Sequence, residues 1–305
     1  MKKWYLWAIL PWVTACSQAP TISADLFPAA GAKNVNPDTH LVLTFPTAPV
    51  VGDSGMVRIF DAETHELVDS LDLSIPAGPT ERRTYGPECD YTKVPYDYTR
   101  DKMPTNKDTR PGTPSGTAEP TPPDYQLNII GGFTDAFHFY PIIVQGNMAT
   151  IYPHNNMLEY DKKYYVTIDK GVINLPDGSF DGVGQEHEWI FATKKSAPAS
   201  MDTLVVDCNG YGDFNTVQGA LDFIPDFATN PTVILVQPGD YEELVYARNK
   251  SNVKIKGAGM GQTKVHYANN EVFNPHPLTV KTNEWPGTFP SRRAAFMLDN
   301  CNDIV

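Results

Sequence analysis

The hydrophobic pattern near the C-terminus predicts one short amphipathic helix. Four apolar residues recur there at the spacing i, i+3, i+4 and i+7, which places them on one helical face. Asn215, with Gln218 three residues later, is expected to form a capping box at the start of the helix, and Pro225 cannot continue it. The apolar residues are Val217, Ala220, Leu221 and Ile224.

Short strand-like runs follow this helix at intervals of about ten residues. Gly, Pro and Asn separate the runs, and these residue types turn a chain. No helical segment long enough for a crossover connection lies between them. The spacing therefore predicts a parallel β-helix, a solenoid of stacked coils, with the amphipathic helix covering the apolar end of the first coil. The runs are residues 232–236, 244–246, 253–256 and 263–267.

The N-terminal part of the chain, residues 24–194, alternates apolar and polar positions like a half-buried sheet, as in Leu41, Leu43 and Phe45. A turn is expected at residues 61–64. The later strands resemble those of bacterial Ig-like domains, in which a tyrosine at a strand corner bonds back to the backbone, and Tyr164 is the candidate. The other expected strands are residues 57–60, 66–73, 125–130, 137–144, 148–152 and 189–193.

Composition marks the boundaries between these parts. Residues 86–124 are rich in Pro, Thr, Asp and Lys, and such a stretch cannot bury enough apolar surface to offset its ordering entropy. We expect a long insertion there between two strands of the sandwich. Residues 195–202 have the composition of a linker, and residues 203–305 follow as the solenoid. The expected fold class is all-β: an Ig-like β-sandwich, then the first coils of a right-handed parallel β-helix with a short capping helix.

The first fifteen residues have the pattern of a targeting segment. Lys2 and Lys3 precede an apolar stretch too short to span a bilayer. The small residue before Cys16 resembles a bacterial lipobox, which implies removal of residues 1–15, lipidation of Cys16 and a polar tether over residues 16–23. This predicts a lipid anchor in the bacterial cell envelope, at the outer membrane on its periplasmic or cell-surface face. Separately, we expect the protein to be a monomer. The other interpretation is an ordinary secretory peptide with an incidental cysteine.

Charge and cysteine usage exclude several kinds of site. A formal net charge of −12 and a pI near 4.9 argue against nucleic acid, which rewards clustered Lys and Arg. The three remaining cysteines are odd in number and far apart, and the histidines are scattered, so neither a disulfide framework nor a zinc site is indicated. We expect no metal and no cofactor. The cysteines are Cys89, Cys208 and Cys301, the last two expected as small buried residues.

Two motifs in the solenoid favour structural roles. Gly257, Gly259 and Gly261 resemble a phosphate loop, but a strand-like run follows them where such a loop needs a helix, which favours a turn. A nearby carboxylate cluster is not arranged like that of a glycosidase, because neighbours in a turn cannot face one sugar from opposite sides. We expect these carboxylates to be solvated turn charges. They are Asp240, Glu242 and Glu243.

Four blocks of the solenoid, taken in order, resemble the opening of the pectin methylesterase catalytic domain. The first block is residues 210–218, with a glycine-aspartate turn, an aromatic residue and a Thr-Val-Gln helix start, and it is followed by an Ile-Pro exit. The resemblance covers about the last third of the chain. The remaining blocks are residues 233–236, residues 238–243 with their Tyr-x-Glu, and residues 253–263.

This resemblance implies an esterase that hydrolyses the C6 methyl esters of polygalacturonate, so that pectin is the expected partner. Residues 288–291 resemble the family's Thr-Phe-x-Ser segment, whose threonine lines the substrate groove, which makes Thr288 the candidate substrate-binding residue. Arg292 and Arg293 depart from the family pattern. Either they pair with a galacturonate carboxylate or they point into solvent.

The resemblance also implies where the chemistry lies. The family uses an aspartate nucleophile, a second aspartate as acid and base, a glutamine for the oxyanion and an arginine that fixes the nucleophile. These residues follow the Thr-Phe-x-Ser segment on later coils, and no Gln-Asp pair occurs before Val305. We therefore expect no catalytic residue in this chain, a fragment or truncated gene model, and no ester hydrolysis.

Two other functions remain open at this point. The first is a non-catalytic carbohydrate-binding or adhesion lipoprotein, in which sandwich and solenoid hold a polymer without cleaving it. The second is a pectate lyase, which would need calcium held by clustered acids, and the sequence shows no such cluster.

Overall fold

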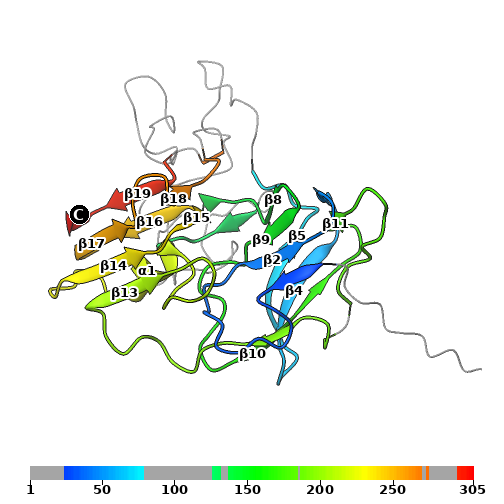
Figure 1. Cartoon of the computed structure of the whole chain (residues 1–305), viewed down its shortest axis with the longest axis horizontal. Coiled ribbons are helices and arrows are strands. Elements are labelled where there is room, and N and C mark those ends of the chain that lie inside the picture. Colours follow the sequence, from blue (N-terminus) through cyan, green and yellow to red (C-terminus); the bar gives the residue numbers. More distant parts are fainter. Residues whose placement is uncertain (1–23, 79–125, 132–136, 185, 270–272, 275–293) are drawn as a thin grey trace, which may run out of the picture.

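The computed structural model describes residues 24–78, 126–131, 137–184, 186–269, 273–274 and 294–305. These residues form almost entirely β structure with one short helix, α1 (Val217–Phe223) (Figure 1). In the described ranges no helix is long and apolar enough to cross a membrane. The expected signal peptide, the lipidation site Cys16 and the insertion at residues 86–124 lie outside the described residues.

The N-terminal domain consists of two four-stranded antiparallel sheets that share one hydrophobic core. Buried and less buried side chains alternate along their strands, so one face of each sheet supplies the core. Trp189 is fully buried in this core, and its Nε1 donates to the Pro28 carbonyl oxygen at 2.9 Å. The first sheet has the order β1 (Asp25–Phe27), β2 (Leu41–Thr44), β9 (Met148–Ile151) and β8 (Ile142–Gln145); the second has the order β12 (Ile190–Ala192), β10 (Lys163–Ile168), β4 (Met56–Asp61) and β5 (Leu67–Asp72); a smaller sheet pairs β3 (Val50–Val51) with β11 (Ile173–Asn174).

Two local features expected from the sequence are present in this domain. The hydroxyl of Tyr164, at the start of β10, accepts a hydrogen bond from the backbone N–H of Glu159 at 2.9 Å, the backbone bond predicted for it. At the turn after β4, Asp61 Oδ1 accepts from the backbone N–H groups of Glu63 at 2.8 Å and Thr64 at 3.1 Å. A side-chain acceptor thus stabilises each corner.

One expected strand, residues 137–144, is broken in the structure. It forms β7 (Phe137–His138) and β8, because Pro141 has no N–H group to donate to a ladder. Strand β7 pairs with β6 (Leu127–Asn128) and not with the main sheets. The N–H of Tyr140 donates to the hydroxyl of Tyr267 at 2.7 Å, so the break turns this segment toward the C-terminal domain.

The C-terminal domain is a solenoid in which strands of successive coils pair in parallel (Figure 1). Residues of the same kind stack in register, as where Leu204, Ile234 and Ile255 lie side by side and contribute to one core. The strand runs expected from the spacing are all present. The structure adds β15, where the sequence favoured a turn. The first sheet contains β13 (Thr203–Val206), β14 (Thr232–Val236), β17 (Ser251–Gly257) and β20 (Asn302–Ile304); the second pairs β15 (Gly239–Glu242) with β18 (Thr263–His266); the third pairs β16 (Val245–Arg248) with β19 (Phe296–Asp299).

One corner of the solenoid repeats its geometry from coil to coil. Asn249 after β16 and Asn300 after β19 both have positive φ, 58° and 51°, a conformation that Asn tolerates better than most residues. Asn300 Nδ2 donates to Asn249 Oδ1 at 2.7 Å, and Asn249 Nδ2 donates to Asp226 Oδ2 at 3.0 Å. A polar ladder therefore runs along this corner with one side chain from each successive coil.

The glycine-rich segment is a turn between strands, as predicted. Gly259 and Gly261 have φ of 145° and 80°, values that side chains of L-residues rarely adopt, and β18 follows them directly. At the end of β17, a Cβ atom on Gly257 would lie 3.2 Å from the Cβ of Thr263. The close approach of Thr263 explains why a residue without a side chain occupies position 257.

Replacing Tyr164 with Phe is expected to lower the free energy of unfolding by about 1–3 kcal/mol, because the N–H of Glu159 loses its acceptor. Tyr165→Phe is the matched control, since Tyr165 stacks on Phe60 through its ring, and it is expected to change stability by less than about 0.5 kcal/mol. Urea unfolding followed by circular dichroism measures both. Equal stability of the two variants would contradict a structural role for the Tyr164 hydroxyl.

Candidate functional site

The capping helix α1 begins one residue later than the sequence predicted. Its N-cap is Thr216, whose Oγ1 accepts from the N–H of Gly219 at 2.9 Å. The expected capping box of Asn215 and Gln218 is therefore wrong. Thr216 has the extended backbone of an N-cap, and its hydroxyl is the acceptor that this position requires. The apolar face of α1 packs into the solenoid core, as expected for a cover on the first coil.

Two carboxylates from different domains accept the remaining N–H groups at the start of α1. Asp38 of the sandwich accepts through Oδ2 from the N–H groups of Asn215 at 2.9 Å and Thr216 at 2.8 Å, and from the Thr216 hydroxyl at 2.8 Å. Glu243, which follows β15, accepts from the N–H groups of Val217 at 2.9 Å and Gln218 at 3.0 Å. The first N–H groups of a helix have no partner inside it, and they attract negative charge.

The expectation that Asp240, Glu242 and Glu243 are all solvated turn charges is wrong for Glu243. Its side chain is buried, with the residue 6% exposed, and it serves α1. The other two carboxylates lie on the outer face of β15. Asp240 pairs with His266, and Glu242 Oε2 accepts from Gln145 Nε2 at 2.6 Å. In the described part of the chain, no group of three or more His, Cys, Asp or Glu side chains is arranged to hold a metal ion.

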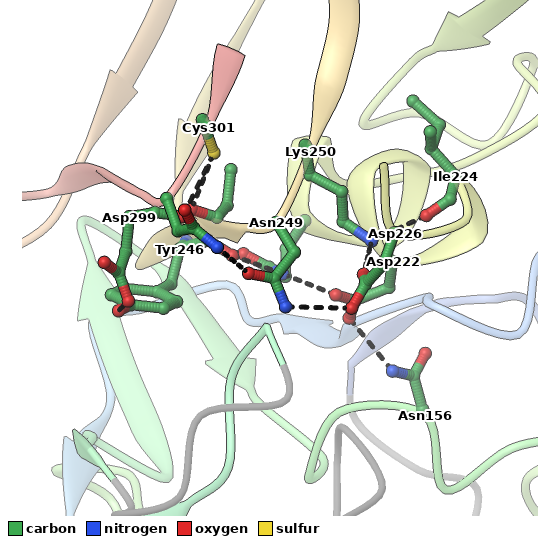
Figure 2. A network of polar contacts seen from close by, with 12 residues as sticks. Asn156, Asp222, Ile224, Asp226, Tyr246, Asn249, Lys250, Asp299 and Cys301 are labelled. Atoms are coloured by element: carbon green, nitrogen blue, oxygen red, sulfur yellow. Dashed lines mark hydrogen bonds and ion pairs between the residues drawn. The ribbon is translucent and has the colours of Figure 1, made fainter. Parts of the chain in front are cut away.

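A lysine binds the C-terminal end of α1 (Figure 2). Lys250 Nζ donates to the carbonyl oxygen of Ile224, the C-cap residue, at 2.6 Å and to Asp226 Oδ1 at 3.0 Å. Lys250 is 6% exposed. Negative charge at the start and positive charge at the end both complement the helix dipole.

A polar network joins α1 to the second coil and to the sandwich (Figure 2). Gln218 exchanges hydrogen bonds with the backbone of Tyr246, accepting from its N–H at 2.7 Å and donating to its carbonyl oxygen at 3.2 Å. Gln218 Nε2 also donates to Asp222 Oδ1 at 2.7 Å. Asn156 of the sandwich donates to Asp222 Oδ2 at 2.9 Å. The helix is thus bonded to elements of both domains.

A small cavity of about 60 Å³ lies at this junction. Burial raises the pKa of Glu243 to about 7 and that of Asp222 to about 6, against the lowering effect of their hydrogen bonds. Burial also raises the pKa of Asp38, while it lowers the pKa of His40 to about 4 and so keeps that ring neutral. No lysine or arginine lines the cavity among the described residues. Its other polar lining residues include Asn128, Asn155, Tyr152 and Tyr267.

Carboxyl groups that titrate near neutrality are candidates for general acid and base catalysis. Two observations favour a structural role here. The carboxylate oxygens of Glu243 already accept backbone N–H groups, and a cavity of about 60 Å³ is several times smaller than the roughly 300 Å³ at which small-molecule pockets begin. This cavity is therefore too small for a sugar, and its carboxylates position α1.

An apolar cluster completes the contact between the domains. Ile130 and Phe137 of the sandwich pack with Leu244 and Tyr246 of the solenoid, and the rings of Phe137 and Tyr246 have centroids 5.4 Å apart. Gly131 approaches so closely that a Cβ atom on it would lie 2.2 Å from the carbonyl oxygen of Tyr246. The outer side of β16 is thus covered by the sandwich.

Thr288, Arg292 and Arg293, the expected groove residues, lie outside the described residues. Described residues near them in sequence contact the sandwich. Asn274 accepts from the N–H of His138 at 2.7 Å and donates to its carbonyl oxygen at 3.0 Å. Phe273 stacks on Tyr140 with ring centroids 4.5 Å apart. Within the C-terminal domain, Asn269 donates to the carbonyl oxygen of Ala294 at 3.1 Å.

The sequence contains a signal for some of the junction residues and none for others. Glu243 belongs to the Tyr-x-Glu that carried part of the family resemblance, so the sequence contained a signal for it. That motif did not indicate that Glu243 accepts N–H groups of α1. Asp38 lies in the Asn-Pro-Asp-Thr loop before β2, which reads as an ordinary turn. Its partners are more than 170 residues away, Asn215 being 177 positions along the chain.

Replacing the N-cap Thr216 with Val is expected to lower the free energy of unfolding by about 1–2 kcal/mol, since Gly219 N–H loses its acceptor and Asp38 a donor. Thr216→Ser keeps the hydroxyl and is expected to stay within about 0.5 kcal/mol of the wild type. Denaturant unfolding of the full chain compares them. If Thr216→Ser destabilised as much as Thr216→Val, the lost methyl contact would be responsible and the cap would not.

Comparison with known proteins finds similarity in the C-terminal part of the chain. Residues 203–299 match the family model described as pectinesterase. The chain is 32% identical over 96 residues to Probable pectinesterase 67 of Arabidopsis thaliana, covering 29% of this chain and 28% of that protein. It is 36% identical over 76 residues to Probable pectinesterase 8 of the same plant, with 24% and 19% covered. It is 37% identical over 70 residues to a pectinesterase/pectinesterase inhibitor of Ficus pumila var. awkeotsang, with 23% and 13% covered.

All three alignments cover less than a third of these relatives, so the chain spans only a small part of their length. The matched family region coincides with the solenoid and its capping helix. The similarity therefore supports the pectinesterase family for residues 203–299 of this chain.

Proposed function

We propose that residues 203–305 are the opening coils of a pectinesterase-type carbohydrate esterase, which hydrolyses the C6 methyl esters of polygalacturonate. The observation that carries this proposal is the agreement between sequence blocks and structure. The Gly-Asp turn, the Thr-Val-Gln helix start and the Ile-Pro exit frame α1, and the later blocks fall on β14, β15 and β17. Together they build a solenoid start within the region that matches the family model.

In this proposal the described residues have a structural role and do not carry out the reaction. Glu243 accepts N–H groups of α1, while Asp240 and Glu242 are paired on the outer face of β15, so none of these three carboxylates is free to act as the attacking group in ester hydrolysis. Asp299 of β19 is bound by Arg248 and by the hydroxyl of Tyr246. Within the proposal, none of the described residues takes the part of the catalytic glutamine, aspartates or arginine. Thr288 is the proposed substrate-binding residue.

The chain of 305 residues by itself is expected to release no methanol from esterified pectin, because the proposal assigns it no catalytic residue. A methanol assay on the purified chain measures this, with a commercial pectin methylesterase as positive control. Sustained turnover above the rate of a heat-denatured sample would show that the described coils or Thr288 and its neighbours do carry the chemistry.

Substrate binding is expected even without turnover. Thr288→Ala should weaken binding of methyl-esterified oligogalacturonides by roughly threefold to tenfold, the usual effect of losing one hydrogen bond to a ligand. Thr203→Ala is the matched control, since Thr203 is an exposed threonine of the same domain, in β13. Isothermal titration calorimetry gives the affinities. Absence of binding by the wild-type chain, or equal loss in both variants, would count against the proposed groove.

A further inference from the structure

Three carboxylates reach the domain junction from three different elements. Asp38 comes from the loop before β2, Asp222 from α1, and Glu243 from the connection between β15 and β16. All three line the same cavity of about 60 Å³. Asp38 bonds across the boundary to Asn215 and Thr216, while Asp222 receives its bond from Asn156 of the sandwich. Asp222 and Glu243 both belong to the solenoid, and docking of the two domains adds Asp38 to them.

One cation acts on this group from outside the cavity, because the charge of Lys250 lowers the pKa of Asp222. Lys250 is bound to Asp226 and to the far end of α1. His154 on the sandwich side pairs with Asp69 at 2.7 Å. Lys194 of the sandwich reaches across the same boundary, where its Nζ donates to the carbonyl oxygen of Gly212 at 2.7 Å. Other titratable groups that face the junction are His40, which packs on Tyr152 with ring centroids 4.4 Å apart; Glu242, bonded to Gln145; Asp213, bonded to the N–H of Val205; and the hydroxyls of Tyr152, Tyr160 and Tyr267.

We propose that Asp38, Asp222 and Glu243 form a proton-operated latch between the sandwich and the solenoid, which tightens as the pH falls below neutrality. Docking removes the three carboxylates from water and places them beside one another without a cation in the cavity lining. Backbone and amide N–H donors offset part of this cost. Each proton taken up by the cluster removes one of the three charges and so lowers the remaining repulsion.

The direction of the pH effect follows from the two protonation equilibria. In the docked state burial raises the pKa of Glu243 to about 7 and that of Asp222 to about 6, whereas the same groups exposed to water titrate near their ordinary values of 4.5 and 3.8. The docked state therefore binds more protons between about pH 4 and about pH 7. Docking is strongest at the acidic side of this window and weakens as the pH rises through it.

Asp38 offers a clean way to remove one charge from the latch. Its Oδ2 accepts all three hydrogen bonds from Asn215 and Thr216, while its buried Oδ1 has no hydrogen-bond partner among the described residues. Asp38→Asn can therefore keep the three bonds through its amide oxygen and place the NH₂ group where Oδ1 lies. Glu243 lacks this freedom, because each of its oxygens accepts one N–H group.

The consequence for activity rests on the proposed function, although the latch does not. Hydrolysis of a methyl ester adds water across the acyl C–O bond and yields methanol and a carboxylic acid. At neutral pH that acid ionises and releases one proton for each ester cleaved. The proposed reaction would thus acidify its own surroundings and hold the two domains together while de-esterification proceeds.

Hydrogen exchange of the Asn215 and Thr216 amides tests the latch on the full chain without substrate, so the result is independent of esterase activity. After correction for intrinsic exchange, wild-type protection is expected to fall by roughly fivefold or more from about pH 5.5 to about pH 7.5, since one proton changes an equilibrium at most tenfold per pH unit. The amides of Val166 and Ile168 in the sandwich core report global unfolding and should hold their protection.

Asp38→Asn is expected to reduce this change to less than half of the wild-type value. Asp181→Asn, which neutralises an exposed carboxylate paired with Lys170, should behave like the wild type. Protection that stays constant or increases with pH in the wild-type chain overturns the proposal, and this measurement needs no variant to fold. An unchanged pH dependence in a folded Asp38→Asn chain also overturns it.

Discussion

The N–H groups at the start of α1 need acceptors, and the arrangement of both domains depends on how those acceptors are supplied. Thr216 provides one oxygen, Glu243 of the second coil provides two, and Asp38 reaches in from the sandwich. A helix of seven residues lies well below the roughly 12–15 residues at which isolated helices become stable in water. Its existence therefore rests on contacts from elsewhere in the chain.

This dependence explains why the sandwich and the solenoid are difficult to regard as independent modules. The apolar contacts of Phe137 with Tyr246 and the close approach of Gly131 exclude water from one side of the junction. The polar contacts of Asp38, Asn156 and Gln145 occupy the other side. Hydrophobic burial supplies the attraction, and the hydrogen bonds favour the relative orientation in which most buried polar groups keep a partner.

Much of this fold could be predicted from the sequence, since its periodic signals are local. Spacing alone located β14, β16, β17 and β18, and the glycine turn before β18 followed from the absence of a helical pattern. Strand β15 was missed because Gly239 and Asp240 resemble turn residues, whereas its pairing with β18 and the burial of Tyr241 depend on the neighbouring coil. Local propensity cannot register a partner that lies a full coil away.

The junction escaped prediction for the same reason at a longer range. A capping residue was placed at Asn215 from a sequence template, but the side chain of Asn215 bonds to Asn36 of the sandwich, and the cap falls on Thr216. Glu243 looked like a solvated turn charge until the helix above it was in place. The assignment of Thr288 to the substrate groove comes from family resemblance alone. The hydrophobic pattern and local propensities around it neither support nor oppose that assignment.

The acceptor that Asp38 lends to α1 has a consequence for protein engineering and for domain shuffling in evolution. An exchange of the N-terminal domain would transfer the loop that contains Asn36 and Asp38 along with it, and the incoming loop would need a carboxylate or an equivalent oxygen at the same place. Domain boundaries drawn at the linker are thus too simple a guide to where such a chain can be cut. A functional unit of this solenoid includes a few residues that precede it by more than 160 positions, such as Asp38 relative to Thr203.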